Sequence, residues 1–197
     1  MTRAASRSRT TGETGIEINL DIDGVGETDV STGLPFFDHM LDQLGRHSGF
    51  NLSVRASGDI EVDAHHTVED TAILLGACLG EALGDKAGVR RFASNVVPLD
   101  EAAVEVVLDL SGRPFLFYDV EPPGQKILGD PPFDPQLMEE FWRALVTAAG
   151  LTLHVESRRG RNTHHIVEAS FKAVARALRD AVRVDGGTAV PSTKGTL

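Results

Sequence analysis

The first half of the chain alternates between two hydrophobic periods. Residues 16–23 and 51–56 place apolar side chains at about every second position, as β-strands do. Residues 35–44 begin with a proline suited to a helix's first turn, and their apolar side chains then recur at helical spacing. A second helical stripe runs from about His65 to Leu83. The pattern predicts strand, helix, strand and second helix, with further strands between them.

The second half repeats this pattern. Residues 104–110 alternate as a strand does, and residues 164–182 carry a helical stripe for which Asn162 or Thr163 is a good N-cap. Four blocks match in the same order: Ile16–Asp21 with Val104–Asp109, Phe37–Leu44 with Met138–Leu145, Phe50–Val54 with Gly150–Val155, and His65–Glu69 with His164–Glu168. A repeat of this kind predicts an α+β fold of two duplicated half-domains, with layered sheets and helices.

The repeat also predicts the domain boundaries. Residues 13–95 are expected to form the first half-repeat and residues 96–185 the second, with residues 186–197 as a C-terminal substrate-binding tail. Residues 1–12 contain three arginines, no acidic residue and no apolar core of a signal peptide, so we expect a disordered leader there.

Charge and cysteine content narrow the class of protein. The net charge is −10 and the pI is near 5.1, which argues against broad contact with nucleic acid or an anionic membrane. It leaves room for a small basic pocket that binds one phosphate. The single cysteine, Cys78, lies in an apolar stretch, and we expect a buried thiol. One cysteine allows no disulfide within the chain, which suits the reducing cytoplasm. No apolar run approaches the roughly 18 residues of a membrane span.

The two H-H-x-V-E motifs carry the strongest chemical signal. On a helix, residues four positions apart share a face, so His65 can bind one ion with Glu69, and His164 with Glu168. The second histidines of the motifs point elsewhere. They could join the other helix's pair if the two repeats face each other.

This geometry predicts two related metal sites. One such motif alone is often an exposed pair, but two copies in a duplicated frame favour metal binding. The first expected set is His39, His66, His164 and Glu168, and the second is His65, Glu69, Glu140 and His165. His154 is an alternative ligand, although Ser53 occupies its counterpart and a structural role suits a strand histidine better. Nitrogen and oxygen ligands leave manganese, zinc, iron and cobalt open.

Five segments of the chain resemble one enzyme family. They are Phe36–Leu44, Asp63–Asp70, Leu108–Pro114, Asn162–Ala169 and Pro191–Gly195. On them the chain resembles the imidazoleglycerol-phosphate dehydratases over its length after the first dozen residues. The resemblance implies a fold like domain 2 of ribosomal protein S5, two manganese ions per active site, and a 24-subunit shell whose active sites lie between subunits. It departs from some relatives at Glu140, where they carry histidine.

The resemblance also implies a substrate site. Phosphate binding is implied for Arg91, Arg113 and the tail residues Ser192, Thr193 and Lys194. Further substrate contacts are implied for Glu13, Gln43, His47 and Lys172. Gln43 and His47 follow His39 by one and two turns of the same predicted helix, which favours their proximity to a metal.

The implied reaction is dehydration of D-erythro-imidazole glycerol phosphate to imidazole acetol phosphate in histidine biosynthesis. We expect it to pass through an imidazolate bound by two manganese ions, with Glu13 or Glu168 removing the proton. A di-metal hydrolase and a non-catalytic, metal-binding assembly protein are the alternatives. An RNA-binding module is disfavoured by the acidic charge.

Overall fold

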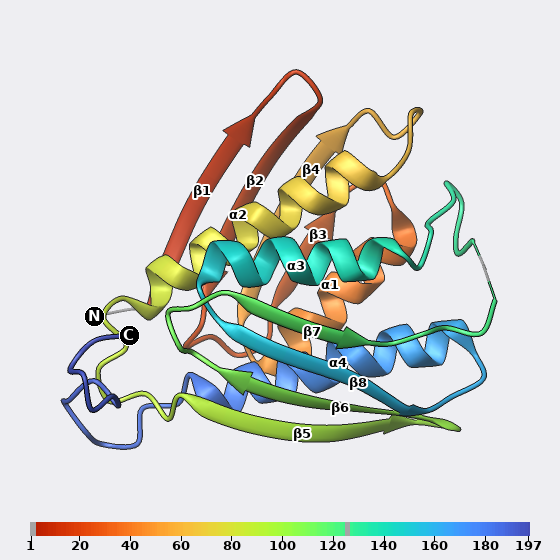
Figure 1. Cartoon of the computed structure of the whole chain (residues 1–197). Helices are drawn as coiled ribbons and strands as arrows, with labels where there is room; N and C mark the ends of the chain where they lie inside the picture. Colours follow the sequence, from red (N-terminus) through yellow and green to blue (C-terminus); the bar gives the residue numbers. More distant parts are fainter. Residues whose placement is uncertain (1–2, 125–126) are drawn as a thin grey trace.

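The computed structural model describes residues 3–124 and 127–197 and shows one order of elements twice (Figure 1). The first half contains β1 (Ala4–Thr10), β2 (Thr14–Asp21), β3 (Thr28–Ser31), α1 (Pro35–Ser48), β4 (Asn51–Gly58) and α2 (His65–Leu83). The second half contains β5 (Phe92–Leu99), β6 (Ala102–Asp109), β7 (Phe115–Asp119), α3 (Leu137–Ala149), β8 (Thr152–Arg159) and α4 (Thr163–Ala181). The predicted duplicated α+β fold is therefore confirmed. Within the described ranges, no helix combines the length and apolar character needed to cross a membrane.

Each half builds one four-stranded sheet with the same connectivity. The strand orders are β1-β2-β4-β3 and β5-β6-β8-β7, and the last pair of each sheet, β3 with β4 and β7 with β8, is parallel. Alternate side chains of the central strands, such as Ile18, Val54 and Val106, are fully buried on the inner face. The sheets therefore present one face to a helical layer and leave the other face outside.

The helices join the two halves. α2 and α4 each cover the sheet of their own half, whereas α2 packs against α3 and α1 packs against α4. The α2–α3 contact is close: a Cβ atom at Gly76 would lie only 2.5 Å from the carbonyl oxygen of Leu145. Trp142 of α3 and Phe171 of α4 pack with tilted rings, whose centroids lie 4.6 Å apart, in the shared core. The helices of one half thus complete the core of the other.

The expectation of a disordered leader is wrong for residues 4–10. This segment forms β1 and pairs antiparallel with β2 from Ala4 opposite Asp21 to Thr10 opposite Gly15. Its arginines are held by acidic residues of α2, with Arg7 bound to Glu81 and Arg9 bound to Asp70. Ala5 is buried, but the next positions on the same face of the strand are Arg7 and Arg9, so the segment has no hydrophobic period, which explains the error. Residues 1–2 of the expected leader lie outside the described residues.

The predicted boundary between the two half-repeats, at residues 95 and 96, does not coincide with the boundary between elements in the structure. β5 spans it and pairs along its length with β6, as β1 pairs with β2. The second unit therefore begins at Phe92, and each unit has four strands. The proposed role of residues 186–197 as a substrate-binding tail stays a prediction.

The outer faces of the two sheets differ in polarity. Strand register places Ser6, Asn19, Ser53 and Asp29 in one row across the first sheet. The matching rows of the second sheet carry the partly exposed apolar residues Phe92, Val107, Phe115 and Phe117. His154 lies among them, with its ring 5.8 and 5.5 Å from the rings of Phe115 and Phe117. The second sheet thus exposes an apolar patch, made of these four residues and His154, that the first sheet lacks.

Candidate functional site

Three predicted ligands meet between α1 and α4. Glu168 Oε2 lies 2.9 Å from His164 Nε2 and 3.3 Å from His39 Nε2. One ligand atom from each residue lies within 4.8 Å of the others, and no other group of three or more His, Cys, Asp or Glu residues among the described ranges does so. The helical prediction that His164 and Glu168 share a face is confirmed, and α1 supplies His39 across the junction between the halves.

The carboxylate of Glu168 is buried and ionised. Lys172, one turn further along α4, places its Nζ 2.6 Å from Oε1. Burial raises the pKa of Glu168, but the hydrogen bond and charge of Lys172 and the hydrogen bonds of His164 and His39 outweigh it and lower the pKa to about 2. Two imidazole nitrogens and an ionised carboxylate form a donor set that suits a divalent transition metal. The residues present therefore fit a metal ion.

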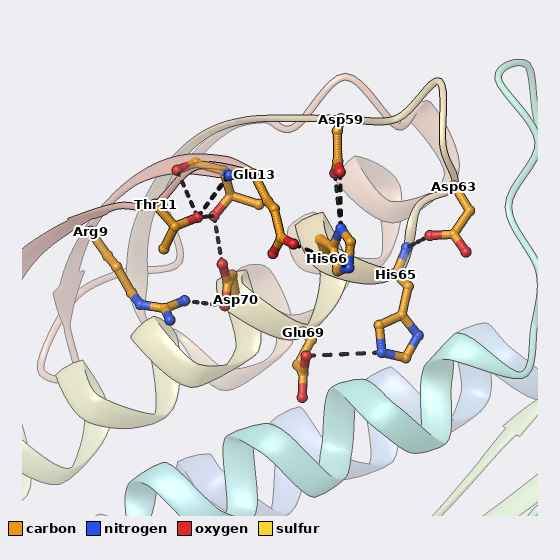
Figure 2. Close-up of polar contacts among 10 residues, drawn as sticks. Arg9, Thr11, Glu13, Asp59, Asp63, His65, His66, Glu69 and Asp70 are labelled. Carbon is orange, nitrogen blue, oxygen red and sulfur yellow. Dashed lines mark hydrogen bonds and ion pairs between the residues drawn. The ribbon is translucent and has the colours of Figure 1, made fainter.

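The first repeat shows a looser counterpart at the start of α2. His65 Nε2 lies 3.9 Å from Glu69 Oε2, and both side chains project from α2 on the side away from Glu13 and Asp59 (Figure 2). Glu140 of α3 lines the same cleft of about 1010 Å³ as His65. The Glu140 carboxylate lies 3.7 Å from Arg143. Within the described part of one chain, the ligand atoms of this second set are thus not gathered as those of His39, His164 and Glu168 are, and the set stays a prediction.

The second histidines of both motifs lie apart from these groups. His66 Nδ1 lies 3.1 and 3.0 Å from the two carboxylate oxygens of Asp59, and this hydrogen bond raises the pKa of His66 (Figure 2). Nε2 of His66 lies 3.9 Å from Glu13 Oε1. Within one chain His66 therefore does not join His39, His164 and Glu168 as the facing-repeat hypothesis expected.

His165 is held in a similar way by Glu101, in the β5–β6 turn. Its Nδ1 lies 2.7 Å from Glu101 Oε2, while Oε1 accepts the backbone N–H groups of Arg161 and Asn162 at 3.0 and 2.8 Å. The bond from His165 and these two N–H groups lower the pKa of Glu101 to about 2, and the bond to Glu101 raises the pKa of His165. Asn162 is the N-cap, as predicted, and accepts the N–H groups of His164 and His165.

Sequence reasoning missed Asp59 and Glu101. Glu101 could have been found, because it follows Glu13 by the same 88 positions that separate Val104 from Ile16. Asp59 gives no such signal, since Gly160 follows β8 where Asp59 follows β4.

Glu13 lies in the β1–β2 turn with 57% of its side chain exposed. Its N–H is held by Thr11 Oγ1 at 3.1 Å, and the neighbouring Thr14 donates to the buried Asp70 of α2 at 2.5 Å. Arg9 binds the other oxygen of Asp70 (Figure 2). This network fastens the turn to the first turns of α2, so Glu13 projects beside His66.

The predicted phosphate-binding residues line one cavity of about 650 Å³. Its walls include Arg91, Arg113, Ser192, Thr193 and Lys194. Arg91 donates to both oxygens of Asp109 at 2.7 and 3.1 Å and to the carbonyl of Pro191 at 2.7 Å. Arg91 therefore anchors the tail over the cavity. The positive charges of Arg91, Arg113 and Lys194 all lie along its wall.

The remaining predicted residues lie on α1 and α4. His47 is half-buried, and burial followed by the charges of Lys172 and Arg176 lowers its pKa, with Glu168 opposing. Gln43 is half-buried one turn before it. His154, the alternative ligand, lies on the outer face of the second sheet and is not part of the His164 group.

A duplicated α+β fold with a histidine–carboxylate centre, nearby acid–base groups and a cationic cavity defines a metal-dependent enzyme. The particular family follows from comparison with known proteins. The family model described as imidazoleglycerol-phosphate dehydratase matches residues 32–178, and the chain belongs to this family of dehydratases.

Relatives match over nearly the whole chain. The imidazoleglycerol-phosphate dehydratase of Acidothermus cellulolyticus is 54% identical over 99% of this chain and 93% of its own length. That of Acidiphilium cryptum is 55% identical, with full coverage of both chains. Among solved structures, the Staphylococcus aureus dehydratase superposes with a TM-score of 0.82 at 38% identity, covering 92% of this chain and 99% of that one. The Pyrococcus furiosus protein, solved with (S)-C348, has a TM-score of 0.82 at 32% identity and covers 97% and 100%.

Proposed function

We propose that this chain dehydrates D-erythro-imidazole glycerol phosphate to imidazole acetol phosphate in histidine biosynthesis. The observation that carries the proposal is the group of His39, His164 and Glu168, formed between the two repeats of a chain whose full-length relatives are imidazoleglycerol-phosphate dehydratases. The substrate joins an imidazole ring to a phosphate, and the chain offers a metal centre and a separate cationic cavity.

The proposed cofactor is a pair of manganese ions per active site. His39, His164 and Glu168 would hold one ion, and His65, Glu69 and Glu140 the other. Because His66 and His165 face away within their own chain, we assign them to the centres of neighbouring copies. When bound, the ions would act as Lewis acids toward the imidazole nitrogens and stabilise negative charge on the ring.

Glu13 is the better proton acceptor of the two candidate glutamates. Glu168 is buried and already shared among His164, His39 and Lys172, which suits a ligand. Glu13 is exposed beside His66 on a turn fastened to α2. In this proposal its carboxylate takes the proton from the carbon next to the one that loses the hydroxyl group, and the resulting enol ketonises.

The cationic cavity would bind the phosphate. Within the described part of the chain, Asp109 occupies much of the Arg91 guanidinium, whereas no carboxylate pairs with Arg113 or Lys194, which line the cavity. Lys172, which binds Glu168, and Gln43 and His47 on α1 lie on the metal side and would contact the substrate there. Binding at two ends fixes the reacting carbons between them and lowers the entropic cost of the elimination.

Self-association to a 24-mer is part of the proposal. The outward patch of Phe92, Val107, Phe115, Phe117 and His154 supports it, because an apolar sheet face of this kind marks a protein–protein interface more often than free surface. We further propose a cytoplasmic location, which suits a chain whose single cysteine, Cys78, allows no intrachain disulfide. The thiol is buried, and burial raises its pKa to about 11, so it is unreactive.

The proposal is tested by turnover of imidazole glycerol phosphate by purified protein, stripped of metal and reloaded with manganese. Imidazole acetol phosphate formed only after reloading supports the reaction and the metal's role. No product from folded, metal-loaded protein would reject it. Hydrolysis of a simple phosphate ester by the same preparation would favour a di-metal hydrolase instead.

A further inference from the structure

The second histidines of the two motifs are held alike by carboxylates from different elements. Asp59, from the loop after β4, faces Nδ1 of His66 at 3.0 Å (Figure 2), and Glu101, from the β5–β6 turn, faces Nδ1 of His165 at 2.7 Å. An ionised carboxylate only accepts hydrogen bonds, so Nδ1 carries the proton in both rings. In the neutral form of each ring, which is the form that binds a metal, the lone pair is then on Nε2.

The two carboxylates are not related by the repeat. Glu101 occupies the repeat position of Glu13, in the turn between the first two strands of its half. The loop position of Asp59 is taken in the second half by Gly160. In the second repeat the turn carboxylate therefore holds the histidine, whereas in the first repeat the loop carboxylate does so and Glu13 stays 3.9 Å from Nε2 of His66.

We infer that Asp59 and Glu101 are positioning residues that fix Nε2 of His66 and His165 as their metal-binding atoms, and that Asp59 thereby frees Glu13 to act on the substrate. The inference rests on the proposed function, since it assigns these histidines to the metal centres. A carboxylate on the far nitrogen of a ligating histidine orients the ring, selects the tautomer and raises the basicity of the ligand.

The surroundings of the two carboxylates predict different responses to an amide. Oε1 of Glu101 is fixed by the N–H groups of Arg161 and Asn162, so a glutamine at this position keeps its oxygen there and turns its NH₂ toward His165. That NH₂ favours the tautomer protonated on Nε2, which blocks metal binding. Both oxygens of Asp59 face the same nitrogen, so an asparagine there can still present its oxygen to His66.

The test measures manganese binding to metal-free protein by calorimetry and by the electron paramagnetic resonance signal of free Mn²⁺. We expect Glu101→Gln to weaken binding about 10- to 100-fold at one class of site, Asp59→Ala to do the same at the other class, and Asp59→Asn to have a smaller effect. Glu105→Gln is the matched control, because Glu105 lies on β6 and binds Arg158 rather than a histidine.

Circular dichroism and sedimentation of each metal-free variant check folding and assembly. If Glu101→Gln does not fold, Asp59→Ala still decides the role of the loop carboxylate. Wild-type manganese affinity and stoichiometry in both folded Glu101→Gln and Asp59→Ala would overturn the inference. Failure of the proposed function would give a different result. The wild-type protein would bind manganese and the variants would bind it more weakly, but no preparation would dehydrate the substrate.

Discussion

Lys172 Nζ lies 2.6 Å from Oε1 of Glu168, one turn away on the same helix. The positive charge of Lys172 thus balances the carboxylate at Oε1, while His164 and His39 contact the other carboxylate oxygen, Oε2. The arrangement keeps a buried acid ionised beside two imidazole rings, and an ionised carboxylate is the state that a divalent cation requires.

The pair of Glu168 and Lys172 makes the free energy of unfolding depend on pH in the acid range. Because the folded pKa of Glu168 is lowered from 4.5 to about 2, its contribution is complete above pH 4.5 and is lost as the pH falls toward 2. Lys172→Met should lower the Tm of metal-free protein at pH 7, with the difference from wild type shrinking as the pH falls below 4.5. Arg143→Met, which removes an exposed pair with Glu139, should give a small difference at all pH values. A Lys172→Met deficit that stays constant with pH would contradict this account.

Two glutamine variants separate the proposed proton acceptor from the proposed ligand. Glu13→Gln should lower kcat by about 10²- to 10⁴-fold and leave manganese binding intact, because Glu13 is exposed and outside the ligand group. Glu168→Gln should lower both. Steady-state kinetics measures kcat of the two variants and metal titration measures their manganese binding. Glu17→Gln, on the outer face of β2, is the control. Equal loss of manganese from both variants would reject the division of roles.

Arg113→Met should weaken substrate binding. Loss of a charge-assisted hydrogen bond to phosphate predicts a rise in KM of about 10- to 100-fold, with a smaller change in kcat. Inhibition by inorganic phosphate should weaken in parallel, since it uses the same cavity. Arg55→Met is the matched control, because it also removes one arginine but takes it from an exposed ion pair with Asp29 on the first sheet. An unchanged KM with altered kcat would place Arg113 outside the phosphate site.

Phe117→Glu should disrupt self-association. The substitution puts a charge in the apolar patch of the second sheet, next to Phe115 and His154. Sedimentation velocity should show smaller species than wild type at the same concentration. Val25→Glu changes a residue that is 80% exposed and belongs to the first half, so its particle should keep the wild-type size. Wild-type sedimentation of Phe117→Glu would exclude this face as an interface.

Local periodicity explains what could be predicted from the sequence. The helix at His65–Leu83 was predicted at its observed bounds, and the pairing of His164 with Glu168 follows from helical geometry alone. β1 could not be predicted, because it is held by pairing with β2 and by ion pairs with α2, and such contacts leave no apolar pattern in the sequence.

The surroundings of the second histidines are a different matter. The position of His66 depends on Asp59, which is close in sequence but has no counterpart in the other repeat. The position of His165 depends on Glu101, which lies 64 residues away. Contacts of this kind are set by tertiary packing, and periodicity carries no information about them.

The close approach of α2 and α3 at Gly76 bears on the origin of the chain. Each repeat covers its own sheet with one helix but leaves the remaining helix surfaces to be covered by the other repeat. A solitary repeat would expose those surfaces to water, so an ancestral half-length polypeptide would have needed a second copy of itself to fold. The present chain thus has the architecture of a homodimer fused end to end, in which the covalent link allows the two halves to differ in sequence.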